Sequence, residues 1–261
     1  MKEYWKNIYR TRYFWSHLAR CELKARFRRS KLGLLWTVLQ PLFLTMIMAG
    51  VFSTVFRQPL GEYAVYILSG IVVWNLVSAS IIGGGNSILS AEQYIRQFSH
   101  PVSIYSLRSA VLCLITFMIE MIALTIWVLF TRPINLLIGI AIFPVTLILY
   151  FILSWSCTTI SGFCNCKYRD YPQIMSLCMQ ALWYMSPVMF QKQVFEGNDK
   201  LFLLYELNPV THVLNLVRNP MLYGTMPSAL DYSYSVLLCA VFATWAYSVN
   251  KKNWKKIIFY L

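Results

Sequence analysis

Long uncharged runs alternate with short charged segments along this chain. The first run extends from residue 32 to 56 and follows directly on a group of cations between residues 26 and 31. A helix needs about 20 apolar residues to cross the hydrocarbon core of a bilayer, and basic residues are retained on the cytoplasmic side. The recurring pattern predicts six membrane spans, at residues 32–56, 63–87, 109–130, 136–163, 171–190 and 232–250.

The lysines and arginines are spread unevenly over the segments between these runs. All but five of the 23 fall on the two tails, or on loops that a six-span arrangement places on the same side as the tails. Cytoplasmic segments carry the excess of Lys and Arg, so the distribution predicts that both termini are cytoplasmic. The five on the opposite side are Arg57, Arg132, Lys192, Lys200 and Arg218.

Composition strengthens the membrane interpretation. Of the 261 residues, 58% are hydrophobic and only 13% are charged, whereas soluble domains carry about 25% charged residues. The basic tail and the long first run argue against a cleavable signal peptide. Because the net charge of +13 resides mainly in cytoplasmic segments, it predicts contact with anionic lipid and not with nucleic acid.

The N-terminal segment, residues 1–31, is amphipathic at helical spacing. This pattern is typical of a helix lying in the membrane interface, although a cytoplasmic helix packed on a partner would show it too. The apolar side carries Tyr4, Trp5, Ile8, Trp15 and Leu18, and the polar side carries Lys2, Lys6, Arg10 and His17.

A second amphipathic segment lies between spans two and three. Ile88, Ala91, Ile95 and Phe98 recur at helical spacing with polar residues between them, and His100-Pro101 ends the pattern. The sequence predicts a short cytoplasmic helix. Its apolar stripe would fit a groove on a partner protein or rest on the bilayer, and periodicity leaves both open.

The segment of residues 191–231 is too long for a turn. It contains two short apolar patches, at residues 201–207 and 210–217, and neither could span a bilayer. Two short helices are therefore expected, either at the outer interface or dipping in and returning. Irregular backbone at that depth persists only against protein or a watery cavity, which indicates a pore mouth.

Residues that could carry chemistry are few. Gly83-Gly84-Gly85 lacks the following Lys and Ser/Thr of a phosphate-binding loop, so it predicts a weakened helix and no ATP hydrolysis by this chain. The seven cysteines are scattered, as membrane thiols are, and the three histidines fall in separate segments, so no metal site is expected.

Four side chains within the predicted spans are candidates for a functional role. Glu120 is the one acid well inside a span, so it is either a functional carboxylate or a hydrogen-bonding partner for another helix. Trp36, Trp183 and Tyr184 either pack and form interfacial belts, or line a conduit where their rings would stack on sugars.

Several short motifs occur in a characteristic order along the chain. They are RSKLGLLW at residues 29–36 running to QPL at 40–42, YRDYP at 168–172, SPV at 186–188, and LNPVT at 207–211 followed by Arg218. With these motifs the chain resembles, over essentially its whole length, the permease subunit of polysaccharide-exporting ABC transporters. These are the Wzm- and KpsM-like proteins of the ABC-2 family.

The resemblance implies an all-α integral membrane protein, with the interface segment at residues 1–31 and one transmembrane domain at residues 32–261. It implies a homodimer in the bacterial cytoplasmic membrane that binds two copies of a separate ATPase, which would hold ATP and Mg. The cargo would be a polysaccharide linked to undecaprenyl diphosphate, of O-antigen, capsule or teichoic-acid type.

The resemblance also implies roles for particular residues. Two short helices between spans five and six would form an outer gate that includes Ser186, Pro187, Asn208, Pro209 and Arg218. The cytoplasmic helix between spans two and three would be a coupling helix that docks on the ATPase. Its residues would include Ser90, Glu92, Tyr94, Ile95, Arg96 and Phe98.

A hypothesis about the cargo follows. Arg26, Arg28, Arg29 and Lys31 would hold the lipid pyrophosphate at the inner face, or else they serve topology alone. One departure concerns residues 191–193, Gln-Lys-Gln, where relatives often carry proline. It leaves the geometry of the outer gate open.

Three other classes compete with this interpretation. One is an ABC-2 permease for a drug or small lipid, and another is a structural membrane partner without transport. The third is a membrane-embedded lipid or sugar transferase, which would need acid and base groups at the interface. Only Asp170, Glu92 and His100 are candidates for that work.

Overall fold

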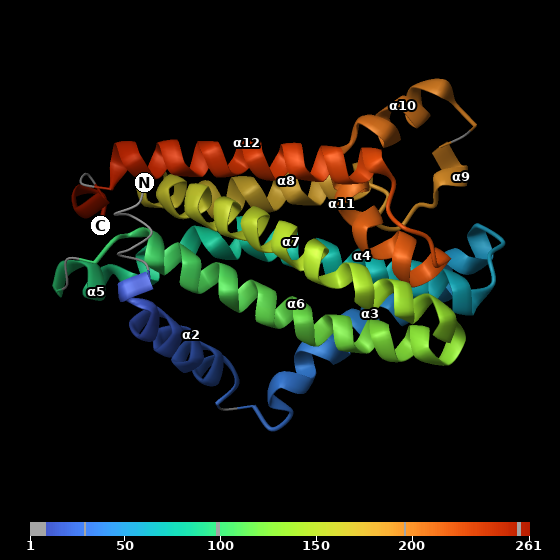
Figure 1. Ribbon diagram of the computed structural model, residues 1–261, viewed down its shortest axis with the longest axis horizontal. Helices are drawn as coiled ribbons and strands as arrows, with labels where there is room; N and C mark the ends of the chain where they lie inside the picture. Colours follow the sequence, from blue (N-terminus) through green and yellow to red (C-terminus); the bar gives the residue numbers. More distant parts are fainter. Residues whose placement is uncertain (1–8, 29, 98–99, 196, 255–256) are drawn as a thin grey trace.

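The described part of the chain is helical throughout (Figure 1). The computed structural model describes residues 9–28, 30–97, 100–195, 197–254 and 257–261, and no strand occurs among them. The longer helices are α2 (Arg12–Phe27), α3 (Trp36–Val55), α4 (Leu60–Ile81), α6 (Ser103–Thr131), α7 (Pro133–Lys167), α8 (Tyr171–Met185) and α12 (Ala229–Asn253). The short elements are η1 (Gly33–Leu35), η2 (Gly83–Asn86), η3 (Leu89–Ala91), α5 (Glu92–Gln97), α9 (Lys192–Phe195), α10 (Asp199–Leu207), α11 (Pro209–Arg218), η4 (Asn219–Tyr223) and η5 (Ile257–Phe259).

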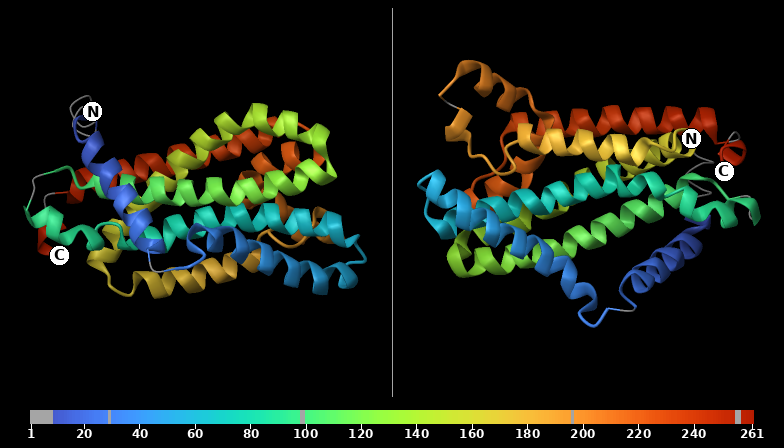
Figure 2. Two further views of the ribbon diagram at one scale, coloured as in Figure 1. Left: turned by 90° about the horizontal axis from the view of Figure 1, so that it is seen from below. Right: turned by 180° about the vertical axis from the view of Figure 1, so that it is seen from behind.

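Helix α4 lies at the centre of the bundle. It packs against α3, α6, α7 and α11, and most of its apolar residues are buried in the main core. Figures 1 and 2 show α4, α6, α7, α8 and α12 running along the long axis. Helices α9 and α10 lie at one end and α5 lies at the other (Figure 1).

Five helical segments are long and apolar enough to cross a membrane. They are Gly33–Val55, Leu60–Asn86, Ser103–Thr131, Pro133–Lys167 and Ala229–Asn253. Large apolar side chains lie exposed along several of these helices, as expected of a surface that faces lipid. They include Ile122, Ile126 and Leu129 on α6, Ile140 and Ile148 on α7, and Val236, Leu237 and Val241 on α12.

The span predicted at residues 171–190 is shorter than expected. Helix α8 ends at Met185 after 15 residues, and residues 186–190 form turns. Ser186 has extended backbone angles (φ −104°, ψ 151°) because the residue before a proline disfavours the helical conformation. The six-span count therefore depends on whether α8 and this turn together cross the bilayer.

The contacts of α8 show how far it reaches. Near its start, the Tyr171 hydroxyl donates to Ser161 Oγ at 2.7 Å and lies 3.5 Å from the Ile81 carbonyl at the end of α4. Just beyond its end, the Pro187 carbonyl accepts from the Tyr66 hydroxyl near the start of α4. Residues 66 to 81 of a helix rise about 22 Å, so α8 and its turn run beside most of α4.

The glycine cluster marks the expected break in a helix. Gly83–Asn86 form a 3₁₀ turn after α4, which confirms the predicted weakening. A Cβ added at Gly84 would lie 2.9 Å from the Thr158 Cα, so the backbones of η2 and α7 approach closely there. Asn165 of α7 donates to the Gly85 carbonyl at 3.0 Å and satisfies the unwound backbone.

The apolar face predicted for the N-terminal segment packs within the chain. Trp15 and Leu18 of α2 contact a cluster at the start of α6 that includes Tyr105. Glu22 of α2 also pairs with the buried Arg108 of α6 at 3.1 Å. The expectation that Trp15 and Leu18 dip into lipid is corrected, while Tyr4, Trp5 and Ile8 lie outside the described residues.

The apolar stripe of the cytoplasmic segment is also covered by the chain itself. Ile88 and Ala91 are fully buried, and Ile95 packs against the same clusters. The expectation that this stripe faces a partner groove or the bilayer is therefore wrong for Ile88 and Ala91, because α6 and the C-terminal Ile257 cover them, and Ile95 is covered in part. Phe98 lies outside the described residues.

The close approach at Gly84 gives a test of the fold. Gly84→Ala should lower the unfolding midpoint of the purified protein, since overpacking costs about 1–3 kcal/mol. Gly83→Ala is the matched control, because a Cβ there meets nothing within 4 Å. The measurement is thermal unfolding in detergent followed by intrinsic fluorescence. Equal midpoints for the two variants would contradict the packing described.

Candidate functional site

Arg218, at the end of α11, has a buried and fully hydrogen-bonded side chain. It is only 2% exposed. Its Nε donates to Ser69 Oγ at 3.3 Å, and Nη1 donates to the Tyr66 hydroxyl at 3.0 Å and the Pro187 carbonyl at 2.5 Å. Its Nη2 donates to the Tyr66 carbonyl at 3.3 Å and the Val188 carbonyl at 2.7 Å.

These contacts use the whole donor capacity of the side chain. A guanidinium has five N–H groups, and here each has a neutral oxygen as acceptor. The Tyr66 ring adds a cation–π contact, with the guanidinium carbon 3.8 Å from the ring centroid. Arg218 therefore fastens the turn after α8 onto α4, and it has no donor left for a ligand.

Two tyrosines of α4 complete the fastening of this turn. The Tyr63 hydroxyl donates to the Met189 carbonyl at 3.1 Å, and the Tyr66 hydroxyl donates to the Phe190 carbonyl at 2.8 Å. The carbonyls of residues 187 to 190 thus all accept hydrogen bonds from α4 or Arg218. Carbonyls released where a helix ends need such partners when water is excluded.

Gly70 makes the close approach of the turn to α4 possible. A Cβ at this position would lie 2.5 Å from the Val188 carbonyl oxygen and 2.6 Å from Arg218 Nη2. Any side chain would push the turn and the guanidinium away from α4.

Asn208 joins the same turn to the two short outer helices. Its Nδ2 donates to Ser186 Oγ at 3.0 Å, and its Oδ1 accepts from Val210 N at 2.9 Å as the N-cap of α11. Pro209 follows at the first helical position, which it favours. The structure thus brings Ser186, Pro187, Asn208, Pro209 and Arg218 together, and α10 and α11 confirm the two expected short helices.

A buried contact between a histidine and an aspartate connects α11 to α12 beside this cluster. His212 Nδ1 lies 2.9 Å from Asp231 Oδ1, and Nε2 lies 2.9 Å from the Glu206 carbonyl. That carbonyl only accepts, so Nε2 carries a proton. Asp231 also accepts from Asn215 and from Ser228, which is typical of an ionised carboxylate. The Asp231 carboxylate thus accepts on both oxygens, and a contact at each ring nitrogen fixes the orientation of the His212 ring.

The wall around this pair contains further polar groups. A cavity of about 380 Å³ opens beside it and is also lined by Tyr205, Tyr223, Lys192 and Glu206. Burial raises the pKa of the Tyr205 hydroxyl above its usual value, so this side chain stays neutral. Lys192 and Glu206 lie 3.9 Å apart across the cavity wall, which leaves their charges largely balanced.

The predicted conduit aromatics have different surroundings. Trp183 packs edge-on against Trp74 of α4, with ring centroids 5.2 Å apart. Trp36 and Tyr184 are 49% and 62% exposed, so only these two have rings free for another molecule. Helices α3 and α8, which carry them, lie on one face of the bundle on either side of α4 (Figure 2).

The intramembrane acid is engaged with a neighbouring helix. Glu120 of α6 is 4% exposed, and its Oε2 accepts from Asn75 Nδ2 of α4 at 3.0 Å. This geometry is that of an interhelical hydrogen bond, the structural alternative that the sequence left open.

The basic cluster lies where α2 leads into α3. Arg28 and Lys31 are exposed there, and Arg26 belongs to the last turn of α2. Arg29 and the side chain of Arg26 lie outside the described residues, so their placement relative to one another stays a prediction.

The described residues also bear on metal and thiol chemistry. All seven cysteines are free. Among residues 9–28, 30–97, 100–195, 197–254 and 257–261, no three His, Cys, Asp or Glu side chains gather as a metal site. Two of the acid and base candidates for a transferase have partners of their own, since Glu92 pairs with Arg96 and the His100 ring contacts Phe14.

Comparison with known proteins identifies the class. The profile of the ABC-2 type transporter family matches residues 13–222, and the chain belongs to this family. An O-antigen export system permease protein, RfbA, from Myxococcus xanthus is 24% identical over 219 residues, which cover 80% of each chain. RfbA of Klebsiella pneumoniae is 24% identical over 220 residues, covering 83% of this chain and 82% of its own.

Another relative is named for the transport of a different cargo. The polysialic acid transport protein KpsM of Escherichia coli is 21% identical over 234 residues, covering 84% of this chain and 85% of its own. Family membership, together with the apolar helices, establishes a multi-pass membrane protein of transporter type. The transferase and the purely structural interpretations are thereby set aside.

Sequence reasoning missed several partners in this site. It did not pair Tyr63 and Tyr66 with the turn after α8, although their i, i+3 spacing places both hydroxyls on one face of α4. It placed His212 and Asp231 in the same segment of residues 191–231 but predicted no contact between them. The capping signature Ser228-x-x-Asp231 was visible, but it does not reveal a histidine partner.

Replacement of the guanidinium tests the role given to Arg218. Arg218→Lys keeps the charge but has three donors instead of five, so at least two of the oxygens lose their donor. Hydrogen bonds to charged groups contribute about 1.5–3 kcal/mol each, so a stability loss of roughly 3 kcal/mol or more is expected. Thermal unfolding of the purified protein measures it. Arg57→Lys, at an exposed position of the same end, is the control, and equal loss in both variants would refute the assignment.

Proposed function

We propose that this chain is the membrane subunit of an ATP-driven exporter of polysaccharide. One observation carries the proposal: relatives named as O-antigen export permeases align with about four-fifths of this chain and of their own length. The polysialic acid transport protein supports the same class of cargo. The exported material is a long glycan attached to a lipid diphosphate such as undecaprenyl diphosphate.

The chain crosses the bacterial cytoplasmic membrane six times in this proposal. Helix α8 and its turn form the fifth crossing, which their reach beside α4 supports. Both termini are cytoplasmic, in agreement with the distribution of Lys and Arg. Contacts at the opposite end support a common outer side, since Arg132 lies 3.6 Å from Glu62 and Gln58 contacts Gln193.

Two copies of the chain enclose the conduit. The face formed by α3 and α8 presents apolar and aromatic side chains that the chain leaves uncovered, and these include Phe43, Met46, Ile47, Ile174, Leu177 and Tyr184. Trp36 and Tyr184 offer rings on which sugars stack. The cluster of Ser186, Pro187, Asn208, Pro209 and Arg218 holds the outer gate at the end of this conduit.

A separate ATPase binds at the cytoplasmic end and supplies the energy from ATP and Mg. Because the apolar stripe of the coupling segment is buried, its polar side forms the docking surface. Tyr94, Gln93 and Arg96 are exposed on α5 and are suited to this contact. In the same segment, Arg108 donates to Ser90 Oγ at 2.8 Å, and Arg96 pairs with Glu92 at 2.9 Å.

The basic residues before α3 bind the diphosphate of the lipid carrier. Arg28 and Lys31 are exposed at the cytoplasmic end of the proposed conduit, and Arg26 and Arg29 lie beside them in sequence. Arginine donates paired hydrogen bonds to phosphate oxygens, which gives this role a chemical basis.

Export itself is tested in the cells that carry this chain. Deletion should remove the polysaccharide from the cell surface and leave it inside the cell, and the wild-type chain should restore it. Extraction of surface glycan and staining of its gel ladder measure both. Unchanged surface glycan after deletion would contradict the proposal and favour a drug or small lipid as cargo.

The diphosphate contact is tested by neutralising two cations. Arg28→Gln with Arg29→Gln should lower surface glycan about tenfold or more, since charge-assisted hydrogen bonds contribute about 1.5–3 kcal/mol each. Arg57→Gln with Lys200→Gln, at the outer end, is the control for charge alone. Normal export by the first pair, with normal insertion and dimerisation, would leave those cations a topological role only.

The docking surface is tested by removing one exposed ring. Tyr94→Ala should reduce the amount of ATPase that copurifies with the tagged permease, because aromatic side chains in buried contacts carry much of the binding energy. Tyr13→Ala, on the exposed side of α2, is the control. Equal recovery of the ATPase with both variants would exclude α5 as the main contact.

A further inference from the structure

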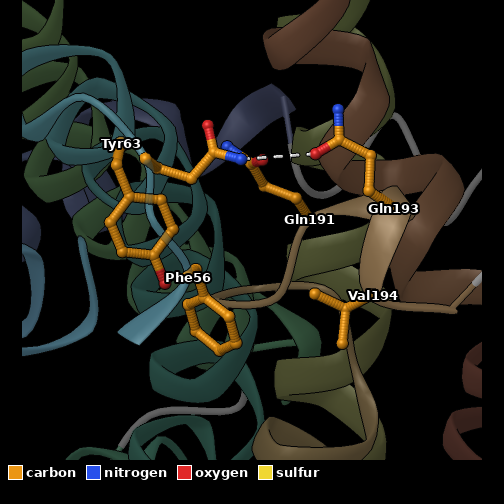
Figure 3. Close-up of a pocket in the computed structure, with 6 residues that line it drawn as sticks. Phe56, Tyr63, Gln191, Gln193 and Val194 are labelled. Atoms are coloured by element: carbon orange, nitrogen blue, oxygen red, sulfur yellow. Dashed lines mark hydrogen bonds between the residues drawn. The ribbon is translucent and has the colours of Figure 1, made fainter. Parts of the chain in front are cut away.

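A small pocket opens at the outer end of the bundle (Figure 3). It lies between the α3–α4 connection and the start of α9, and its volume is about 150 Å³. Six residues line it: Phe56, Gln58, Tyr63, Gln191, Gln193 and Val194. Two of them, Gln191 and Gln193, belong to the Gln-Lys-Gln stretch at residues 191–193, where the family resemblance led us to expect proline. Neither glutamine has a role in the site described above.

Apart from the Tyr63 hydroxyl, the polar side chains that line the pocket are neutral amides. Gln58 Nε2 lies 3.5 Å from Gln193 Oε1, at the limit of a hydrogen bond, so this contact is easily displaced. Each amide offers two donor hydrogens and an acceptor oxygen. The three glutamines therefore retain donors and acceptors for another molecule.

The one cation in this stretch is directed elsewhere. Lys192 Nζ lies 3.9 Å from Glu206 Oε1 and 5.2 Å from the centroid of the Phe202 ring. Lys192 lines the larger cavity beside His212 and not the amide pocket. Successive residues at the start of α9 thus line different cavities: Lys192 lines the larger, charged one, and Gln193 lines the uncharged amide pocket.

The apolar part of the pocket is rigid. The Phe56 ring packs edge-on against Tyr63 at 6.0 Å and against Phe190 at 5.9 Å between centroids. The hydroxyl of Tyr63 is held by the Met189 carbonyl. Figure 3 shows the Phe56 and Tyr63 rings on one side, Gln193 and Val194 on the other, and Gln191 between them.

We propose that this pocket binds one uncharged sugar ring of the exported glycan as it leaves the conduit. Amides that donate and accept side by side match the neighbouring hydroxyls or acetamido group of a sugar, and the fixed aromatic rings match its C–H face. The inference rests on the proposed function, and it names a contact on the outer side for the same cargo.

The size and charge of the pocket narrow the ligand. Drug-sized ligands occupy about 300–1,000 Å³, so 150 Å³ accommodates a single ring and not an oligosaccharide. An ionised sugar acid or phosphate would require a cation, and none of the described residues that line this pocket is one. A polymer in transit also has to be released, and a few exposed neutral hydrogen bonds permit that.

The experiment captures the glycan during export. In cells that contain the complete transporter, Gln193 is replaced with p-benzoylphenylalanine, whose ketone attacks nearby C–H bonds on illumination. The permease should then migrate with a glycan ladder that a polysaccharide stain detects. The matched control carries the same replacement at Met226, which is 75% exposed between η4 and α12 and lies outside the pocket. At least tenfold more adduct is expected at the Gln193 position, a ratio that corresponds to about 1.4 kcal/mol.

A second change tests the amides themselves. Gln58→Leu in the variant with the photoreactive residue should reduce the adduct several-fold while the level of permease in the membrane stays the same. If the Gln193 replacement prevents insertion, the photoreactive residue is placed at Val194, which lines the same pocket. Equal adduct with and without Gln58→Leu would overturn the assignment of the amides.

The outcomes separate this inference from the proposed function. Surface glycan that depends on the chain, with no more adduct at the pocket than at the Met226 position, overturns the pocket and leaves export standing. Surface glycan that does not depend on the chain overturns export, and the pocket assignment with it.

Discussion

The packing of the turn after α8 against α4 depends on one buried guanidinium. A helix that ends inside a membrane protein releases carbonyl groups that no water can satisfy. After α8 these carbonyls belong to residues 187 to 190, and Arg218 with two tyrosines of α4 satisfies all of them. The same contacts explain the glycine at position 70 of α4, because any Cβ there would clash with the Val188 carbonyl oxygen of the turn.

A second buried arginine has a comparable place at the opposite end. Arg108 donates to the Ser87 carbonyl and to Ser90 Oγ, and it pairs with Glu22 of α2. It thereby joins the N-terminal helix, the proposed ATPase-docking segment and α6 at one point. Each end of the bundle thus uses a guanidinium, with its several donors, to hold an irregular segment against regular helices.

Much of this fold could be predicted because its signals are local. Uncharged runs predicted six spans, five of which are helices long enough to cross a membrane, and the glycine cluster predicted the break after α4. Asn208-Pro209 separated the two patches that became α10 and α11. In each case a residue's helix propensity or capping side chain acts within a few residues of the helix end it determines, so the local sequence is enough to predict it.

The remaining features depend on what covers each surface. Periodicity showed that Ile88, Ala91 and Ile95 share a face, yet lipid, a partner or the chain itself could cover that face. The structure buries Ile88 and Ala91 fully and Ile95 in part. Charge counting put Arg218 on the outer side, but its five acceptors come from α4, roughly 150 residues away in sequence, and from the turn after α8, roughly 30 residues away. Such long-range pairings leave no local signal in one sequence.

The central claim is that α8 and the turn fastened by Arg218 cross the membrane and place the outer helices beyond it. Labelling of single cysteines in intact cells tests this most directly. In a cysteine-free chain, Lys200→Cys in α10 should react with a membrane-impermeant maleimide added from outside. Arg169→Cys before α8 should react only after the cells are opened. Labelling of both positions from the same side would contradict the account.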